Sequence, residues 1–242
     1  MSQSKGGRRA VRGSRRSRTS SSARAGVHAR LRYGILGGTF DPPHLGHLVV
    51  AQEVYVRMGL DRVWFLPAGE PPHKAGKIIS PATDRLAMVQ HAIATDDRFA
   101  VSTVELERPG PSYTVDTLRE LRALWGSDVW IVLILGWDML DYLPHWYDAP
   151  GVIAGTDQIA AVHRPGFMVE EGDLSRLEEQ LPGLREKVVL VPVPQLAISG
   201  TDIRSRVAQM LPVRYLLPDA VASYIDKRKL YRESGQREGK KR

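Results

Sequence analysis

Short apolar runs alternate with segments of helical periodicity from residue 31 onward. Most of these runs are continuously apolar, which is typical of strands covered on both faces of a sheet. One of them, "VWIVLIL" at 129–135, has the length of a buried strand. The predicted strands cover residues 32–37, 62–66, 99–104, 129–135, 158–162 and 187–191.

Helical periodicity fills several of the segments between these strands. In 47–58, apolar residues recur at helical spacing, at positions Ala51, Val54, Tyr55 and Met58. Similar stripes run through 114–125 and 201–210. An alternation of strands and helices predicts a parallel sheet with right-handed crossovers, which is a doubly wound α/β domain. The sequence shows neither an internal repeat nor a second domain.

The two ends of the chain differ from its middle. Residues 1–30 are rich in Arg, Ser, Gly and Ala, and we expect them to be disordered because they offer little apolar surface to bury. We favour a solvated tail, while a contact with an anionic polymer and an organellar transit peptide stay open. We therefore expect a single domain at 31–232, followed by a basic C-terminal tail at 233–242.

The formal net charge of +7 arises at these ends. Residues 33–225 contain 16 basic and 24 acidic residues, a net charge of −8, so a nucleic-acid-binding domain is not favoured. The absence of cysteine excludes disulfides, thiolate zinc sites and cysteine nucleophiles. No apolar run approaches the roughly 18 residues that a membrane span needs. We expect a cytoplasmic protein without membrane contact.

The candidate chemistry begins in "YGILGGTFDPPHLGH", residues 33–47. Gly37 and Gly38 follow the first predicted strand and allow a ligand to approach the backbone closely. A helix is predicted to start near Gly46, where free N–H groups favour an anion. His44 and His47 could ligate a metal, act as a general base with a helper, or bind phosphate. The stretch matches neither the Walker loop nor the dinucleotide-binding glycine pattern.

A second motif, "ISGTDIR" at 198–204, has a similar logic. Ser199 is spaced as an N-cap residue, with Asp202 at the third helical position. The helix N-terminus and the forked cation of Arg204 would both favour a phosphate group. Taken alone, the motif is more typical of a plain helix cap with a surface arginine.

Together, "GGTFDPPHLGH" and "ISGTDIR" resemble the paired signatures of the H-x-G-H nucleotidyltransferase superfamily. The blocks "PAGEPPHK", "PSYTVDTL", "GWDMLDYLPHWYD", "RPG" and "LLPDAVASYIDKRKLYR" narrow the resemblance to bacterial nicotinate-nucleotide adenylyltransferases. The resemblance covers residues 31–232. It implies a Rossmann-like fold and the transfer of AMP from ATP to nicotinate mononucleotide, giving deamido-NAD and pyrophosphate in NAD biosynthesis. It also implies Mg²⁺, held mainly by the ATP phosphates, since no carboxylate cage for a metal is visible in the sequence.

The resemblance assigns residues to both substrates. His44, His47 and Arg204 would be catalytic, with the histidines donating hydrogen bonds to the migrating phosphoryl group and taking no proton. The ATP site would comprise Gly37, Gly38, Thr39, Phe40, His44, His47, Gly136, Asp138, Arg164, Ser199, Thr201 and Arg204. The nicotinate mononucleotide site would comprise Thr39, His73, Lys74, Tyr113, Thr114 and Trp146. The family usually has Ser or Ala where this chain has Gly200, and we expect little functional loss from that difference.

Other interpretations stay open from the sequence. The acceptor could be nicotinamide mononucleotide or phosphopantetheine, although enzymes for phosphopantetheine are shorter and lack the "PPHK" and "SYT" blocks. The protein could instead bind nucleic acid through its basic tail, for which we expect at most weak, non-specific contact. The sequence leaves the oligomeric state undetermined.

Overall fold

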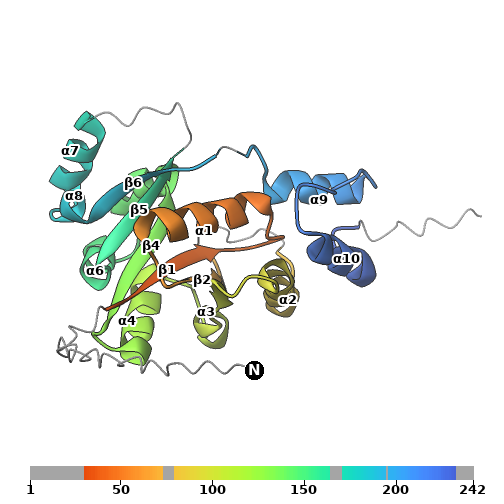
Figure 1. The fold of residues 1–242 in the computed structure, drawn as a ribbon, viewed down its shortest axis with the longest axis horizontal. Coiled ribbons are helices and arrows are strands. Elements are labelled where there is room, and N and C mark those ends of the chain that lie inside the picture. Colours follow the sequence, from red (N-terminus) through yellow and green to blue (C-terminus); the bar gives the residue numbers. More distant parts are fainter. Residues whose placement is uncertain (1–29, 73–78, 164–170, 195, 233–242) are drawn as a thin grey trace, which may run out of the picture.

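A computed structural model describes residues 30–72, 79–163, 171–194 and 196–232 (Figure 1). At its centre lies a six-stranded parallel sheet with strand order β3-β2-β1-β4-β5-β6. The order reverses between β1 and β4, as in a doubly wound sheet, and the predicted Rossmann-like α/β class is confirmed. The strands are β1 (Leu31–Gly38), β2 (Arg62–Pro67), β3 (Phe99–Val101), β4 (Val129–Gly136), β5 (Gln158–His163) and β6 (Val188–Pro192).

Helices connect and cover these strands. In the first half of the chain they are α1 (Leu45–Met58), α2 (Ala82–Ile93), α3 (Val104–Glu107) and α4 (Thr114–Trp125). Beyond β4 come α5 (Trp137–Tyr142), the 3-10 turn η2 (Leu143–His145), α6 (Ala149–Gly155), α7 (Glu171–Gln180), α8 (Leu184–Lys187), α9 (Gly200–Ala208) and α10 (Asp219–Arg228). None of the helices described is long and apolar enough to span a bilayer.

Both faces of the sheet are buried, which explains the continuous apolar run of β4. Ile131, Leu133 and Leu135 pack on one face in a cluster shared with α4 and α6. Val132 and Ile134 point to the opposite face, into a cluster shared with α1 and α2. Because successive side chains of a strand point to opposite faces, a strand covered on both sides is apolar at every position.

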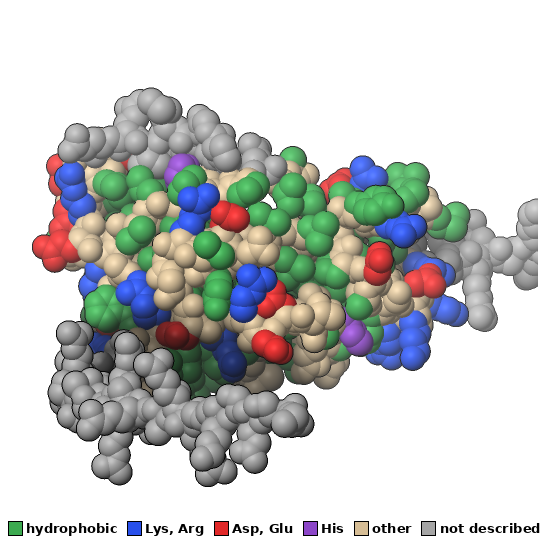
Figure 2. Space-filling view, in the orientation of Figure 1, with side chains coloured by type: hydrophobic (Ala, Val, Ile, Leu, Met, Phe, Trp, Pro, Cys, Tyr) green, Lys and Arg blue, Asp and Glu red, His purple; other side chains and the backbone are tan. Residues whose placement is uncertain are grey.

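Helices α9 and α10 pack beside α2 at one end of the molecule (Figure 1). A third apolar cluster joins them, formed by Met88, Ile203, Leu217, Val221 and Ile225. This cluster anchors α9, the helix that begins within "ISGTDIR", to the rest of the domain. On the face drawn in Figure 2, this end carries Lys and Arg side chains with Asp and Glu side chains among them.

Several predicted boundaries are corrected by the structure. The strand predicted at 99–104 ends at Val101, because Thr103 caps the short helix α3. The helix predicted at 201–210 ends at Ala208. The strand predicted at 187–191 starts one residue later, since Lys187 closes α8. Predictions for 1–29 and 233–242 lie outside the described residues, so the division into tails and one domain stays a prediction.

Candidate active site

The candidate site lies where the carboxyl ends of β1, β2 and β4 meet. In an open parallel sheet, ligands bind beyond these ends, at the point where the strand order reverses. The segment 39–44 follows β1, the segment 68–72 follows β2, and α5 begins directly after β4. The first histidine motif and the predicted acceptor loop therefore leave the sheet as neighbours.

His44 and His47 form a stacked pair at the N-terminus of α1. His44 is the N-cap residue, with φ −139° and ψ 170°. Its backbone N–H donates to Nδ1 of His47 at 3.1 Å, and the two ring centroids lie 3.7 Å apart. A Cβ on Gly46 would lie 3.0 Å from Nδ1 of His44, so glycine leaves room for the ring. The close spacing of the histidines thus brings the two imidazole rings together as one compact hydrogen-bonding group.

The protonation of this pair follows from its surroundings. His44 is 9% exposed, and burial lowers its pKa to about 4, because a charged imidazole loses its hydration there. Among the described residues its Nδ1 has no hydrogen-bond partner. Since Nδ1 of His47 accepts a backbone hydrogen, neutral His47 carries its proton on Nε2. Near neutral pH, His44 is therefore an uncharged hydrogen-bonding group.

Phe40 shapes the loop between β1 and α1. Its backbone is left-handed, with φ +50°, and its ring is buried against His47 and Phe65. A Cβ on Gly38 would lie 3.1 Å from the Phe40 ring, so glycine leaves room for the ring at this position. Phe40 therefore belongs to the core through its side chain and can meet a ligand only through its backbone.

Asp41 connects this loop to distant parts of the chain. Its carbonyl oxygen accepts from Nη1 of Arg204 at 2.6 Å, across 163 residues of sequence. Its carboxylate accepts from the hydroxyl of Tyr231 at 2.6 Å and from the backbone N–H of Ser80 at 3.2 Å. Burial and the Asp41 charge raise the pKa of Tyr231, which keeps the hydroxyl protonated as a donor. The structure thus brings the two predicted motifs together at Asp41.

The "ISGTDIR" segment adopts the predicted cap. The Ser199 hydroxyl oxygen accepts from the backbone N–H of Asp202 at 3.0 Å, and Arg204 also donates to the hydroxyl of Thr201 at 3.2 Å. A Cβ on Gly200 would lie 3.0 Å from the carbonyl oxygen of Asp41. Glycine at this position therefore lets the start of α9 approach the histidine loop closely.

Residues predicted for the acceptor lie around the start of α4. Tyr113 is the N-cap residue of α4, and Thr114 is its first helical residue. The preceding Ser112 joins this start to the loop after β2, accepting from Gly69 N–H through its side chain and donating from its backbone to Glu70, both at 2.9 Å. His73 and Lys74 continue that loop but lie outside the described residues, as does Arg164.

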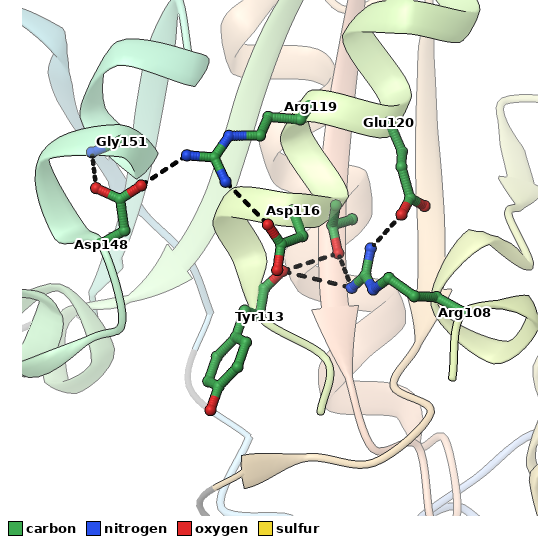
Figure 3. Close-up of polar contacts among 8 residues, drawn as sticks. Arg108, Tyr113, Asp116, Arg119, Glu120, Asp148 and Gly151 are labelled. Atoms are coloured by element: carbon green, nitrogen blue, oxygen red, sulfur yellow. Dashed lines mark hydrogen bonds and ion pairs between the residues drawn. The ribbon is translucent and has the colours of Figure 1, made fainter. Parts of the chain in front are cut away.

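Trp146 lies two residues before Asp148, which a hydrogen bond from Arg119 ties to α4 (Figure 3). It is half-buried and packs against the core cluster that includes α4. The rings of its neighbour Tyr147 and of Tyr113 have centroids 4.4 Å apart. Arg119 donates to Asp116 at 2.9 Å and to Asp148 at 2.7 Å, which links α4 to the cap of α6. Trp146, Tyr147 and Tyr113 therefore lie with the start of α4 on one side of the candidate site, which we call the aromatic wall.

Gly136 and Asp138, both predicted for ATP, stand at the end of β4. Gly136 is the N-cap residue of α5, and the exposed Asp138 lies in the first turn. A Cβ on Gly136 would lie 2.6 Å from Oδ1 of Asp138, so the carboxylate folds back over the glycine. Both residues occupy the sheet edge expected for ligands.

Comparison with known proteins places this geometry in a family. Residues 35–206 match the cytidylyltransferase-like family. A probable nicotinate-nucleotide adenylyltransferase from Dehalococcoides mccartyi is 45% identical over 201 residues, covering 83% of this chain and 97% of that protein. One from Roseiflexus sp. is 48% identical over 199 residues, with coverage of 82% and 97%. The chain belongs to the nicotinate-nucleotide adenylyltransferase family.

A solved structure agrees on the fold. Plasmodium falciparum nicotinic acid mononucleotide adenylyltransferase, in a complex with APC, superposes with a TM-score of 0.67 at 18% identity. The match covers 84% of this chain and 98% of that chain. The same parasite protein has also been solved in a complex with NaAD, with a TM-score of 0.67. At this identity, the likeness shows a shared architecture.

Sequence reasoning missed several polar residues that contact the segments of the candidate site. Arg85 is buried on α2, and Tyr231 lies beyond α10, yet both contact segments around the site. Arg119 and Asp148 support the aromatic wall. The one available signal was an arginine within an otherwise apolar helical stripe in "TDRLAMVQHAI". A solvated arginine at the edge of the stripe would have produced the same pattern.

Proposed function

We propose that this protein transfers AMP from ATP to nicotinate mononucleotide, giving deamido-NAD and pyrophosphate as a step of NAD biosynthesis. The observation that carries the proposal is the hydrogen bond from Arg204 to the Asp41 carbonyl, which joins the two nucleotidyltransferase motifs at one corner. Relatives that are 45% and 48% identical over nearly their whole length, named as probable enzymes of this type, support the choice of substrates.

The donor half of the site would hold the ATP phosphates. Its hydrogen-bond donors come from His44, His47, Arg204 and the N-terminus of α9, whose dipole favours an anion. Backbone groups at Gly37, Gly38 and Thr39, with Ser199 and Thr201, would complete the contacts. The base and ribose would lie over Gly136 and Asp138, with Arg164 as a further contact.

The acceptor half would hold nicotinate mononucleotide. Backbone N–H groups in the first turn of α4, which starts at Thr114 directly after Tyr113, would bind the nicotinate carboxylate, and Trp146 would stack on the pyridine ring. An amide in place of the carboxylate satisfies these donors less well, because they favour negative charge. His73 and Lys74 would bind the phosphate together with Thr39.

The reaction needs positioning and charge stabilisation rather than a base. The acceptor phosphate is ionised near neutral pH and can attack the α-phosphorus of ATP in line, expelling pyrophosphate. The histidines would donate hydrogen bonds to the α-phosphoryl oxygens as charge develops there. Because the pKa of His44 is about 4, this histidine binds as a neutral group and takes no proton from the nucleophile.

Mg²⁺ fits this corner as an ion carried by ATP. The described residues contain no cluster of three side chains able to hold a metal, and both carboxylate oxygens of Asp41 accept hydrogen bonds from the protein. The phosphates would supply most of the ligands, as is usual for this ion. When bound, Mg²⁺ would neutralise phosphate charge.

Since both substrates are phosphorylated metabolites, we propose the cytoplasm as the compartment.

An acceptor comparison tests the proposed function. The purified protein is incubated with ATP and Mg²⁺ plus nicotinate mononucleotide, nicotinamide mononucleotide or phosphopantetheine, and pyrophosphate release is followed. We expect a clear preference for the acid mononucleotide. Equal kcat/KM for the acid and the amide would contradict the carboxylate-binding role of the α4 N-terminus, and turnover with phosphopantetheine alone would contradict the proposed substrate.

A further inference from the structure

Arg85 is a buried cation that serves three segments of backbone. Its side chain extends from α2, and the residue is 2% exposed. The guanidinium donates to four carbonyl oxygens: Ser80 at 3.0 Å, Thr39 at 3.1 Å, Ala68 at 2.5 Å and Gly69 at 3.2 Å. These carbonyls belong to the loop after β1, the loop after β2 and the segment that leads into α2.

This placement is costly for a cation. Burial lowers the pKa of Arg85, because the charged form loses hydration, while the nearby negative charges of Asp41 and Glu105 oppose that effect. An apolar side chain could fill the same volume of core without that desolvation cost. The gain from arginine at this position therefore lies in its geometry, a rigid planar fork that fixes several acceptors at once.

The loops that Arg85 joins follow neighbouring strands and carry different parts of the site. Thr39 precedes the histidine motif, where we place the ATP phosphates. Ala68 and Gly69 open the loop after β2, which the Ser112 side chain joins to the start of α4, where we place the nicotinate carboxylate. Nη1 of Arg85 donates to the carbonyl oxygens of both Thr39 and Ala68, so a single nitrogen joins the two loops.

We propose that Arg85 is a positioning residue that sets the placement of the acceptor loop relative to the ATP loop. This inference rests on the proposed function. Each substrate still has its own contacts without Arg85, but in-line attack requires the two phosphates to meet at a fixed distance and angle. A misplacement of about 1 Å can reduce turnover about 100-fold. Loss of the fork should therefore lower kcat far more than it weakens the binding of either substrate.

Arg85→Lys tests this inference, with Asp84→Asn as its matched control. Lysine keeps the charge but cannot reach four carbonyls at once. Asp84 is the preceding residue and is 3% exposed, yet within the described ranges its carboxylate accepts from Tyr224 and Arg228 of α10 and not from the site loops. Thermal unfolding is measured first, and kcat and both KM values are then measured at a temperature where all proteins are folded.

The expected result is a split between kcat and KM. Arg85→Lys should lower kcat at least about tenfold, with both KM values within about threefold of the parent. Asp84→Asn should lose thermal stability and keep kcat within about twofold. An unchanged kcat in folded Arg85→Lys, or an equal loss in both variants, would overturn the inference.

Gly69→Ala tests the same inference by changing the loop that Arg85 binds. It is the deciding variant if Arg85→Lys does not fold. A Cβ on Gly69 would lie 2.3 Å from the carbonyl oxygen of Glu105, so the substitution must displace the backbone at Gly69 or at Glu105. The carbonyl of Gly69 is one of the four that Arg85 binds. We expect kcat to fall while KM for ATP is kept. Gly172→Ala, on α7 with open space around it, is the control. Unchanged kcat in Gly69→Ala would contradict the inference.

These outcomes are distinguishable from failure of the proposed function. If the parent protein turns over another acceptor better than nicotinate mononucleotide, only the proposed substrate is wrong. The Arg85 variants are then compared with the parent using that other acceptor, and the same split between kcat and KM is the criterion.

Discussion

The buried His44 makes the stability of this protein depend on pH in a defined window. The pKa of His44 is about 4 in the folded protein and 6.5 when exposed. As the pH falls below 6.5, the unfolded chain binds a proton at this position, and the folded protein does not until about pH 4. The stability contribution is therefore complete above the unfolded pKa and is lost as the pH falls towards the folded pKa.

The size of the effect follows from the two pKa values. Each pKa unit corresponds to about 1.4 kcal/mol, so the full difference between 6.5 and about 4 is worth about 3 kcal/mol. Between about pH 6.5 and about pH 5, the loss should reach about 2 kcal/mol. His44→Gln keeps a polar side chain that does not titrate, so the variant should lack this part of the pH dependence.

Urea unfolding measures the difference directly. The five tryptophans provide the fluorescence signal, and the free energy of unfolding is measured from about pH 7.5 to about pH 5 for parent and variant. Carboxylates that titrate in the same window cancel when the two curves are subtracted. His145→Gln, at an exposed position in η2, is the control for loss of one imidazole. Parallel curves for the parent and His44→Gln would refute the assignment of His44 as a buried neutral histidine.

Two further substitutions test the groups around His47 and Asp41. His47→Ala should lower kcat by about 100-fold or more, with an unchanged circular dichroism spectrum, because it removes the proposed donor to the α-phosphate; near-normal turnover in the pyrophosphate assay would remove His47 from the proposed site. Tyr231→Phe should cost about 1–3 kcal/mol in urea unfolding and also lower kcat, because one oxygen of the buried Asp41 carboxylate loses its donor. Tyr224→Phe, whose hydroxyl donates to Asp84 instead, should lose stability alone; equal kcat losses in the two tyrosine variants would contradict a specific role for Asp41.

Local patterns in the sequence predicted the elements of the fold well. The continuous apolar run of β4 indicates a strand covered on both faces, because side chains alternate between two buried sides. The cap at Ser199 was predictable, because it depends on residues three positions apart. The edge strand β3 was predicted too long, since a short apolar segment alone does not show where the ladder with β2 ends.

The sequence by itself determined the succession of strands, three of the helices, the cap at Ser199 and the two motifs whose residue types favour phosphate. Only the tertiary structure decided which distant groups meet. Arg204 and Tyr231 meet at Asp41, and Arg85 donates to the carbonyl oxygens of three backbone segments. It also decided that the pKa of His44 falls to about 4. The physical reason is that caps and stripes depend on neighbours in sequence, whereas burial and hydrogen bonding of a single polar side chain depend on elements that become neighbours only after folding.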